Sequence, residues 1–214
     1  MKNLAICAVM LLIHGSLVAQ GVGHQDILSI RVGDFVLTNA NATSVLRERL
    51  SKHRIRLSLE YSRSDMKSEP STISISGNNA TLRKLLDGFV QLNPNYRWSV
   101  EKGIVSIKPE EVSDREELLD VHLGDFTVSD RSKRETVRAI FETSEVSLFL
   151  LSNGLRENTD STGFGDITAE GCLNVARKNV SVKQLLDDLL LSESINFWAV
   201  FRTGGGRYIR IVID

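Results

Sequence analysis

The spacing of apolar and polar residues along the chain predicts both strands and helices. Apolar residues at alternate positions, as at Leu57 and Leu59, are typical of a strand with one buried face. Apolar residues three and four positions apart, as at Leu82, Leu85 and Leu86, predict a helix with one buried face. The predicted strands are residues 27–36, 55–61, 73–77, 96–100, 104–107, 118–128, 146–151, 173–175, 197–201 and 208–213. The predicted helices are residues 42–50, 82–92, 132–141 and 182–190.

The order of these elements repeats, and short sequences repeat with it. Residues 32–35 return as residues 123–126, an offset of 91. The Leu-Leu-Asp sequence at residues 85–87 returns at residues 185–187, and Trp98 returns as Trp198, both at an offset of 100. Because this period is longer than the roughly 20–50 residues of solenoid repeats, it predicts two copies of one small domain. The predicted division is a first unit at residues 26–108, a charged linker at 109–117 and a second unit at 118–214.

Each predicted unit contains two helices, and each helix has one apolar stripe that must be buried against a sheet. The sequence therefore predicts an α+β fold in which the two helices of each unit pack on small mixed sheets. Capping boxes at residues 132–135 and 181–184 predict where two of the helices begin. We expect Asn41 to cap another helix, and residues 77–79 to end a strand and cap the helix after it.

The first 19 residues have the features of a signal peptide. Their apolar run, residues 4–13, is shorter than the about 20 residues that span a bilayer. We expect cleavage after Ala19, with Gly21 as the second choice, and an uncleaved membrane anchor as the alternative. No later segment predicts a transmembrane span. Cleavage leaves Cys172 as a single cysteine, so no internal disulfide can form, and we expect its side chain to be partly buried.

Composition and charge narrow the possible functions. Hydrophobic residues make up 42% of the chain and charged residues 25%, as in a soluble globular protein. The net charge of −1 provides no bulk attraction to nucleic acid or to an anionic membrane. The histidines after the signal segment lie in separate predicted elements, and no nucleophile motif is found, so we expect no catalytic site and no cofactor.

A loop predicted at residues 153–171 raises the question of a metal. Glu157, Asp160, Asp166 and Glu170 lie in it, but they lack the ordered spacing of a calcium-binding loop. We therefore expect a surface loop, with contact to a partner as its first possible role and metal binding as the alternative.

Six residues near the predicted sheet edges are candidates for contact with a partner. The two tryptophans occupy equivalent strands, where they either pack in a core or act as exposed anchors. The three arginines flank the last hairpin, where they either bind an acidic partner or are simply solvated. Residues 104–107 and 208–213 are the predicted edges that could accept a partner's strand, so that Ile211→Pro would abolish binding and preserve the fold. The six candidates are Trp98, Trp198, Arg202, Arg207, Arg210 and Ile211.

The order of elements resembles the short domain found at the N-terminus of secretins and TonB-dependent transporters. The shared order is a Phe-containing strand, a helix, a hydrophobic strand, a polar loop, a strand, a Leu-Leu helix, an aromatic strand and an Ile/Val strand. We expect the chain to differ from the family in lacking an outer-membrane barrel and a secretin ring domain, and in having extra residues at 153–171. The segments that carry the resemblance are Phe35, 46–50, 57–61, 73–77, 82–92, 96–100 and 104–107, then Phe126, 137–141, 173–175, 182–190, 198–200 and 209–213.

The resemblance implies a non-enzymatic interaction domain in the periplasm. In the transporters such a domain contacts an inner-membrane regulator, and in the secretins it contacts inner-membrane assembly components. We expect an adapter in envelope assembly, transport or signalling, whose partner is a secretin, a TonB-system component or an inner-membrane regulator. One alternative is a small-ligand or peptidoglycan-binding protein, which needs a concave pocket with convergent polar groups. Another is an enzyme with residues 153–171 as a lid, which needs perturbed titratable groups in one cleft.

Overall fold

The structure is a computed structural model that describes residues 26–60, 73–110, 117–158, 172–192, 194–203 and 207–214. Within these residues the fold is α+β, with helices packed on small mixed sheets. The first unit contains β1 (Arg31–Thr38), α1 (Ala42–Lys52), β2 (Arg56–Glu60), β3 (Ser74–Thr81), α2 (Leu82–Leu92), β4 (Tyr96–Glu101) and β5 (Ile104–Pro109). The second contains β6 (His122–Arg131), α3 (Lys133–Phe141), α4 (Ser144–Ser152), β7 (Arg156–Glu157), β8 (Leu173–Ser181), α5 (Val182–Leu191), β9 (Phe197–Thr203) and β10 (Tyr208–Ile213).

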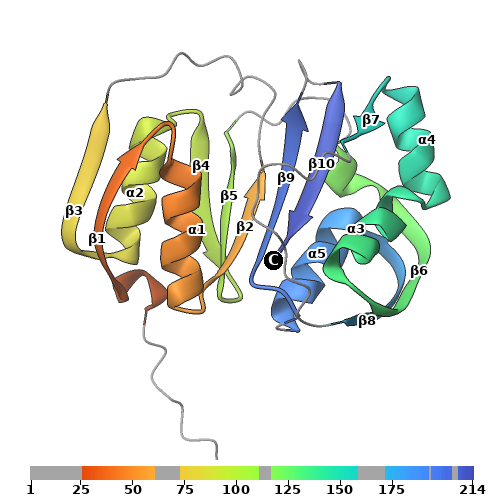
Figure 1. Ribbon diagram of the computed structural model, residues 1–214, viewed down its shortest axis with the longest axis horizontal. Coiled ribbons are helices and arrows are strands. Elements are labelled where there is room, and N and C mark those ends of the chain that lie inside the picture. The colour runs from red at the N-terminus through yellow and green to blue at the C-terminus, as the bar shows by residue number, and fades with distance from the viewer. Residues whose placement is uncertain (1–25, 61–72, 111–116, 159–171, 193, 204–206) are drawn as a thin grey trace, which may run out of the picture.

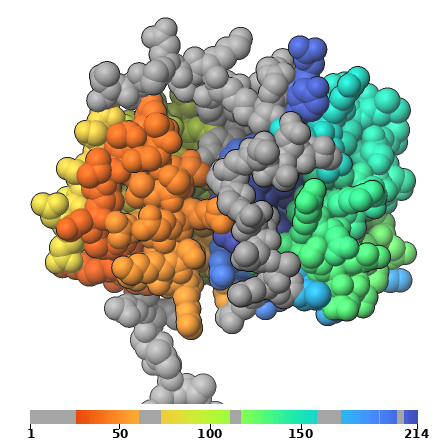
Figure 2. Space-filling view, viewed as in Figure 1, coloured from red at the N-terminus to blue at the C-terminus, as the bar shows by residue number. Residues whose placement is uncertain are grey.

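The two units share one sheet. Its described strands follow the order β4-β5-β2-β9-β10-β7, while β1 pairs with β3 and β6 pairs with β8 in separate two-stranded ribbons. Strand β2 of the first unit and β9 of the second run parallel, with Leu57 opposite Phe197 and Glu60 opposite Val200. Figure 1 shows β9 and β10 in the middle of the molecule, between the two groups of helices, and Figure 2 shows the orange and yellow residues of the first unit on one side and the green and cyan residues of the second on the other. The units are therefore joined through a continuous sheet, in addition to the predicted linker.

The helices of the two units cover opposite faces of this sheet. Helices α1 and α2 lie between the β1–β3 ribbon and the β2 and β4 strands, and α5 lies between β8 and β9 (Figure 1). Along β9, Phe197 and Ala199 belong to the core of the first unit, whereas Trp198 and Val200 belong to the core of the second. Strand β9 is consequently buried on both faces, by a different unit on each.

The predicted helical stripes form much of these cores. On α2, Leu82, Leu85, Leu86 and Phe89 are buried, as the spacing predicts. On α5 the buried residues are Val182, Leu185, Leu186, Leu189 and Leu190. Strand β2 differs from its prediction, because Ser58 is also buried, at 1% exposure. Its hydroxyl lies 2.8 Å from that of Ser106 on β5, which satisfies both groups inside the sheet.

The nine-residue helix α4 accounts for the change of offset between the repeats. Helix α3 begins 91 residues after α1 begins, and α4 ends 100 residues after α1 ends. The turns that follow α1 and α4 are alike: Ile55 N donates to Leu50 O at 2.9 Å, and Leu155 N donates to Leu150 O at 2.8 Å. The extra residues of the second unit are therefore α4, and the prediction that placed them at 153–171 is wrong.

The predicted strand at residues 146–151 is also wrong, because these residues belong to α4. A short apolar run fits a strand or a helix equally well by periodicity alone. Thr143 decides for the helix by accepting a hydrogen bond from Val146 N at 3.4 Å. The strand of this unit follows at β7, and residues 159–171 of the predicted loop lie outside the described residues.

Several element boundaries differ from the prediction. Short 3₁₀ turns at Ile27–Ser29 and Leu118–Asp120 precede β1 and β6, where the sequence predicted strand. Strand β3 continues through the predicted break at residues 77–79, because Asn79 adopts a positive φ of 44° and Asp34 Oδ1 accepts from its N–H at 2.6 Å. Thr81 then caps α2 in place of the expected asparagine.

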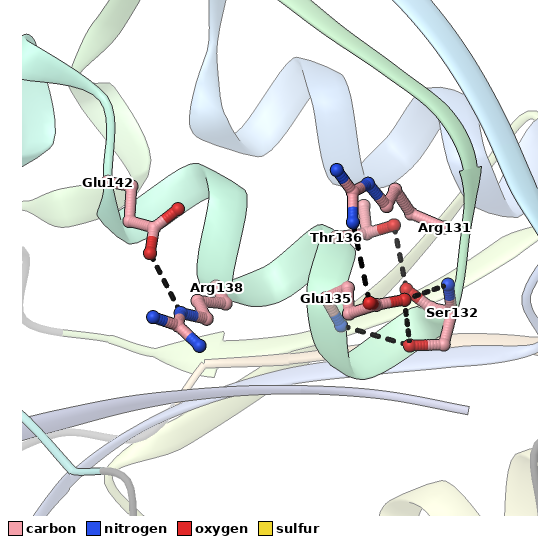
Figure 3. Close-up of polar contacts among 6 residues, drawn as sticks. All are labelled: Arg131, Ser132, Glu135, Thr136, Arg138 and Glu142. Carbon is pink, nitrogen blue, oxygen red and sulfur yellow. Dashed lines mark hydrogen bonds and ion pairs between the residues drawn. The ribbon is translucent and has the colours of Figure 1, made fainter.

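The helix starts in the second unit follow the predicted capping boxes. Glu135 N donates to Ser132 Oγ at 3.2 Å, and Ser132 N donates to Glu135 Oε2 at 2.9 Å (Figure 3). The corresponding box joins Ser181 and Gln184 at the start of α5. Asn41 does precede α1, but its side-chain oxygen accepts from Thr38 N at 2.7 Å and makes no cap bond to the helix.

Candidate interaction surfaces

Both strands predicted as acceptor edges lie inside the shared sheet. Strand β5 pairs with β4 and β2, and β10 pairs with β9 and β7. Ile211 is only 4% exposed and lies opposite Val200 of β9. The prediction that Ile211→Pro would preserve the fold is therefore corrected, since proline at a buried interior strand position disrupts the sheet.

Strand β4 is an edge strand, with β5 as its one neighbour among the described residues. Lys102 and Gly103 connect the two strands in a two-residue turn, with φ of 51° and 77°. Such a turn makes the flanking residues a hydrogen-bonded pair, and the pattern then alternates along the strands. It follows that the backbone groups of Ser99 and Glu101 bond to β5, while those of Trp98 and Val100 point to the open edge.

The same side-chain arrangement surrounds the tryptophan of β4 and that of β9. Trp98 Nε1 donates to Asp87 Oδ1 at 3.1 Å, and the Arg83 guanidinium lies 5.6 Å from the centre of its ring. In the second unit, Trp198 Nε1 donates to Asp187 Oδ1 at 3.0 Å, and Lys183 Nζ lies 4.9 Å from the ring centre. The aspartates and the cationic side chains come from α2 and α5, so the repeat includes this contact between a helix and a tryptophan-bearing strand.

The exposure of the two tryptophans differs because their neighbours differ. Trp198 is 0% exposed, since β2 runs beside β9 and covers its edge. Lys183 also reaches across this junction, with Nζ 3.5 Å from Glu60 Oε1. Burial raises the pKa of Glu60, and the positive charges of Lys183 and Lys108 oppose that effect only in part. Trp98, on the open edge, is half-buried.

The three candidate arginines do not gather with Trp98. Arg202 donates from Nη2 to Glu117 Oε2 at 2.8 Å and ties β9 to the segment before β6. Arg207 is exposed beside the hairpin and Arg210 is half-buried on β10, whereas Trp98 lies at the other end of the sheet. The structure thus separates these candidates, and the tip of the hairpin lies outside the described residues.

Helix α4 presents a surface that the sequence analysis did not identify. Val146 and Phe149 are buried under it, but Leu148 is 64% and Leu151 is 79% exposed. An open pocket of about 390 Å³ lies between α4 and residues 120–122. The signal was present in the sequence, because a helix with apolar residues on both faces must expose one of them unless a partner covers it.

The carboxylate of Glu145, beside α4, is occupied by local hydrogen bonds. Glu145 Oε1 accepts from Gly124 N at 2.8 Å, and Ser144 Oγ donates to its other oxygen at 2.9 Å. The Gly124 N–H is the main cause of a lowered pKa for Glu145. These bonds hold the start of α4 against β6.

The described part of the chain contains no group of three or more His, Cys, Asp or Glu residues arranged to hold a metal ion. Glu157 lies in β7 with a pKa raised by burial, while Asp160, Asp166 and Glu170 are outside the described residues. Cys172 is exposed, which corrects the expectation of partial burial. Its thiol pKa is raised by a hydrogen bond with Asp130 and by the negative charge of that residue.

Comparisons with protein-family models, with curated proteins and with solved structures found no match for the chain. The resemblance to the short domain of secretins and TonB-dependent transporters therefore stays a prediction. No helix within the described ranges is both long and apolar enough to cross a membrane. The predicted signal peptide at residues 1–19 is outside those ranges.

Proposed function

We propose that the protein is a non-enzymatic adapter of the periplasm, which binds another envelope protein during assembly, transport or signalling. The observation that carries this proposal is the exposed apolar face of α4, with Leu148 and Leu151 one helical turn apart. Exposed apolar patches of this kind mark protein–protein contact sites. Helix α4 is also the element that the two units do not share, so it is where the second unit has acquired a surface of its own.

The chemistry of this surface favours a protein partner over a small ligand. A ligand site combines an enclosed apolar pocket with several polar groups that point into it. The pocket beside α4 is open, and the carboxylate of Glu145 already accepts from Gly124 and Ser144. An apolar segment of a partner needs no such groups and would cover both leucines. The partner classes we propose are a secretin, a TonB-system component or an inner-membrane regulator.

The experiment is a crosslinking pull-down of the chain from its native envelope, read by mass spectrometry. We expect enrichment of one of these partner classes and its loss in the variant Leu148→Ser/Leu151→Ser. Val36→Ser/Ile73→Ser is the matched control, since Val36 and Ile73 are also exposed, at 55% and 60%, but lie on or beside the β1–β3 ribbon. This control should retain the partner. Recovery of the bait alone, or of cell-wall fragments alone, would contradict the proposal and favour the peptidoglycan-binding alternative.

A further inference from the structure

The edge of β4 that no described strand covers has the geometry to pair with an identical edge. Trp98 and Val100 direct their backbone groups outward, as the two-residue turn to β5 requires. Their side chains lie on the helix-covered face and are half-buried. On the opposite face, Arg97 and Glu101 are exposed on either side of Ser99. We propose that two copies of the chain pair antiparallel through β4, about a two-fold axis at Ser99.

This register satisfies the backbone of both copies. Trp98 of each copy lies opposite Val100 of the other. Because the backbone N–H and C=O groups of both residues point outward, Trp98 and Val100 form two hydrogen-bonded pairs across the axis. Ser99 meets the Ser99 of the second copy at a non-hydrogen-bonded position, where side chains come closest. The two shared sheets become one sheet that runs through the dimer.

Charge selects this register over its neighbours. With the axis at Ser99, Arg97 of each copy lies opposite Glu101 of the other, which makes two ion pairs across the axis. With the axis at Trp98, Arg97 lies opposite Ser99 and Glu101 lies opposite Asn95. With the axis at Val100, Glu101 lies opposite Ser99 and Arg97 lies opposite Gly103, so neither register pairs the two charges. Arg97, Ser99 and Glu101 follow one another along one face of β4 as a cation, a neutral residue and an anion. A two-fold rotation about Ser99 brings each charge opposite its counterion, as an interface between identical surfaces requires.

The equivalent edge in the second unit shows what a neighbour does to this site. On β9 the positions equivalent to 97 and 99 are Phe197 and Ala199, and β2 covers them in a parallel pairing. On β4 the same positions are Arg97 and Ser99, so an apolar strand such as β2 does not suit this edge. A second copy does, and it would complete the burial of Trp98 that β2 provides for Trp198.

The first test measures self-association of the chain without residues 1–19 by analytical ultracentrifugation. We expect a monomer–dimer equilibrium that Arg97→Glu weakens about tenfold or more, because like charges then face each other twice. The double variant Arg97→Glu/Glu101→Arg should restore dimerisation. Arg97 and Glu101 lie about 13 Å apart along one strand, so rescue has to arise between copies. Lys178→Glu, a change at an exposed position on β8, should leave the equilibrium unchanged.

The second test places a cysteine on the axis. In a Cys172→Ser background, Ser99→Cys should form a disulfide-linked dimer on mild oxidation, since position 99 faces itself. Arg97→Cys in the same background is the matched control and should not crosslink, because position 97 faces position 101. A monomer at all concentrations, a dimer unaffected by Arg97→Glu, or a dimer that the double variant fails to restore would overturn the proposal. If the partner strand ran parallel to β4, as β2 runs parallel to β9, the pairing about Ser99 would not form. One of these contradicting outcomes would then be observed.

Pairing of two copies through β4 does not depend on the adapter role. Leu148→Ser/Leu151→Ser changes α4, which contacts β7 at the opposite end of the sheet from β4. The double variant should therefore leave the dimerisation constant unchanged. Loss of the envelope partner with an intact dimer, or the reverse, therefore separates the two proposals.

Discussion

The two units place the same three-residue contact in opposite surroundings. In each, a strand tryptophan donates to an aspartate and lies beneath a cationic side chain, both of which come from the preceding helix. In the second unit β2 covers that strand, and in the first no described strand does. The local contact is thus encoded twice, while its burial depends on which strand lies next to it. The comparison teaches that equivalent residues in a repeat need not have equivalent roles.

The largest expected difference between the units is in the stability cost of removing each tryptophan. Trp198→Ala should lower the free energy of unfolding by about 3–5 kcal/mol, because the side chain is fully buried. Trp98→Ala should cost about 1–2 kcal/mol, since part of this side chain is already in water. Urea denaturation at a protein concentration low enough for monomers measures both. Equal losses would show that β2 does not protect β9 as the structure indicates.

A smaller difference is expected at the equivalent arginines of α1 and α3. Arg47 Nε donates to Asp214 Oδ2 at 3.1 Å and its guanidinium lies 5.3 Å from the centre of the Phe197 ring, so it joins the two units. Arg138 instead pairs with Glu142 on its own helix, at 2.7 Å, and is largely exposed (Figure 3).

Arg47→Ala should therefore destabilise the protein by about 1 kcal/mol, from an ion pair and a cation–π contact that are both partly shielded from water. Arg138→Ala should cost about 0.3–0.5 kcal/mol, as for other exposed helical ion pairs. Thermal unfolding of both variants measures the difference. A greater loss for Arg138→Ala would contradict the assignment of Arg47 to the junction between the units.

The smallest expected effects are opposite pH dependences at two glutamates. Burial raises the pKa of Glu60 above its ordinary value of 4.5, so its ionised form destabilises the fold. The contribution of protonated Glu60 to the free energy of unfolding is fully present at pH values below the ordinary pKa. It is lost as the pH rises through the raised pKa. Glu60→Gln should then be at least as stable as the parent at neutral pH, with the difference disappearing in acid.

Glu145 should behave in the reverse way. The Gly124 N–H lowers its pKa, so its contribution to stability is present above the ordinary value and is lost as the pH falls through the lowered pKa. Glu145→Gln should be slightly less stable than the parent at neutral pH and equal to it in acid. Denaturation midpoints across this range measure both variants, and parallel curves for the two would contradict the assigned causes.

The elements that the sequence predicted well are those fixed by neighbours along the chain. The stripes of α2 and α5 and the capping boxes at Ser132 and Ser181 depend on contacts within three to four residues, which periodicity and spacing reveal. Helix α4 was missed because its run of apolar residues has no clear period of either kind. The capping hydroxyl of Thr143 was the missed clue.

The candidate sites were harder to predict, because they depend on strand order. Residues 104–107 and Ile211 have the pattern of edge strands, yet both lie inside the sheet. Ser58 has the pattern of a solvent-facing position, yet it is buried between β5 and β9 with its hydroxyl bonded to Ser106. Alternation along a strand reports which side chains share a face, but it does not report what lies beside or above that face.

The sequence by itself determined the two repeats, the helices α1, α2, α3 and α5 and most of the strands, because these follow from residues close together in the chain. The tertiary structure alone decided that β2 pairs with β9. This pairing fuses the units, buries Trp198 and leaves β4 at the edge of the sheet that the described residues form. Leu57 and Phe197, which meet at this junction, are far apart in the sequence. Such a pairing depends on how two complete cores fit together, and no local pattern of apolar and polar residues contains that information.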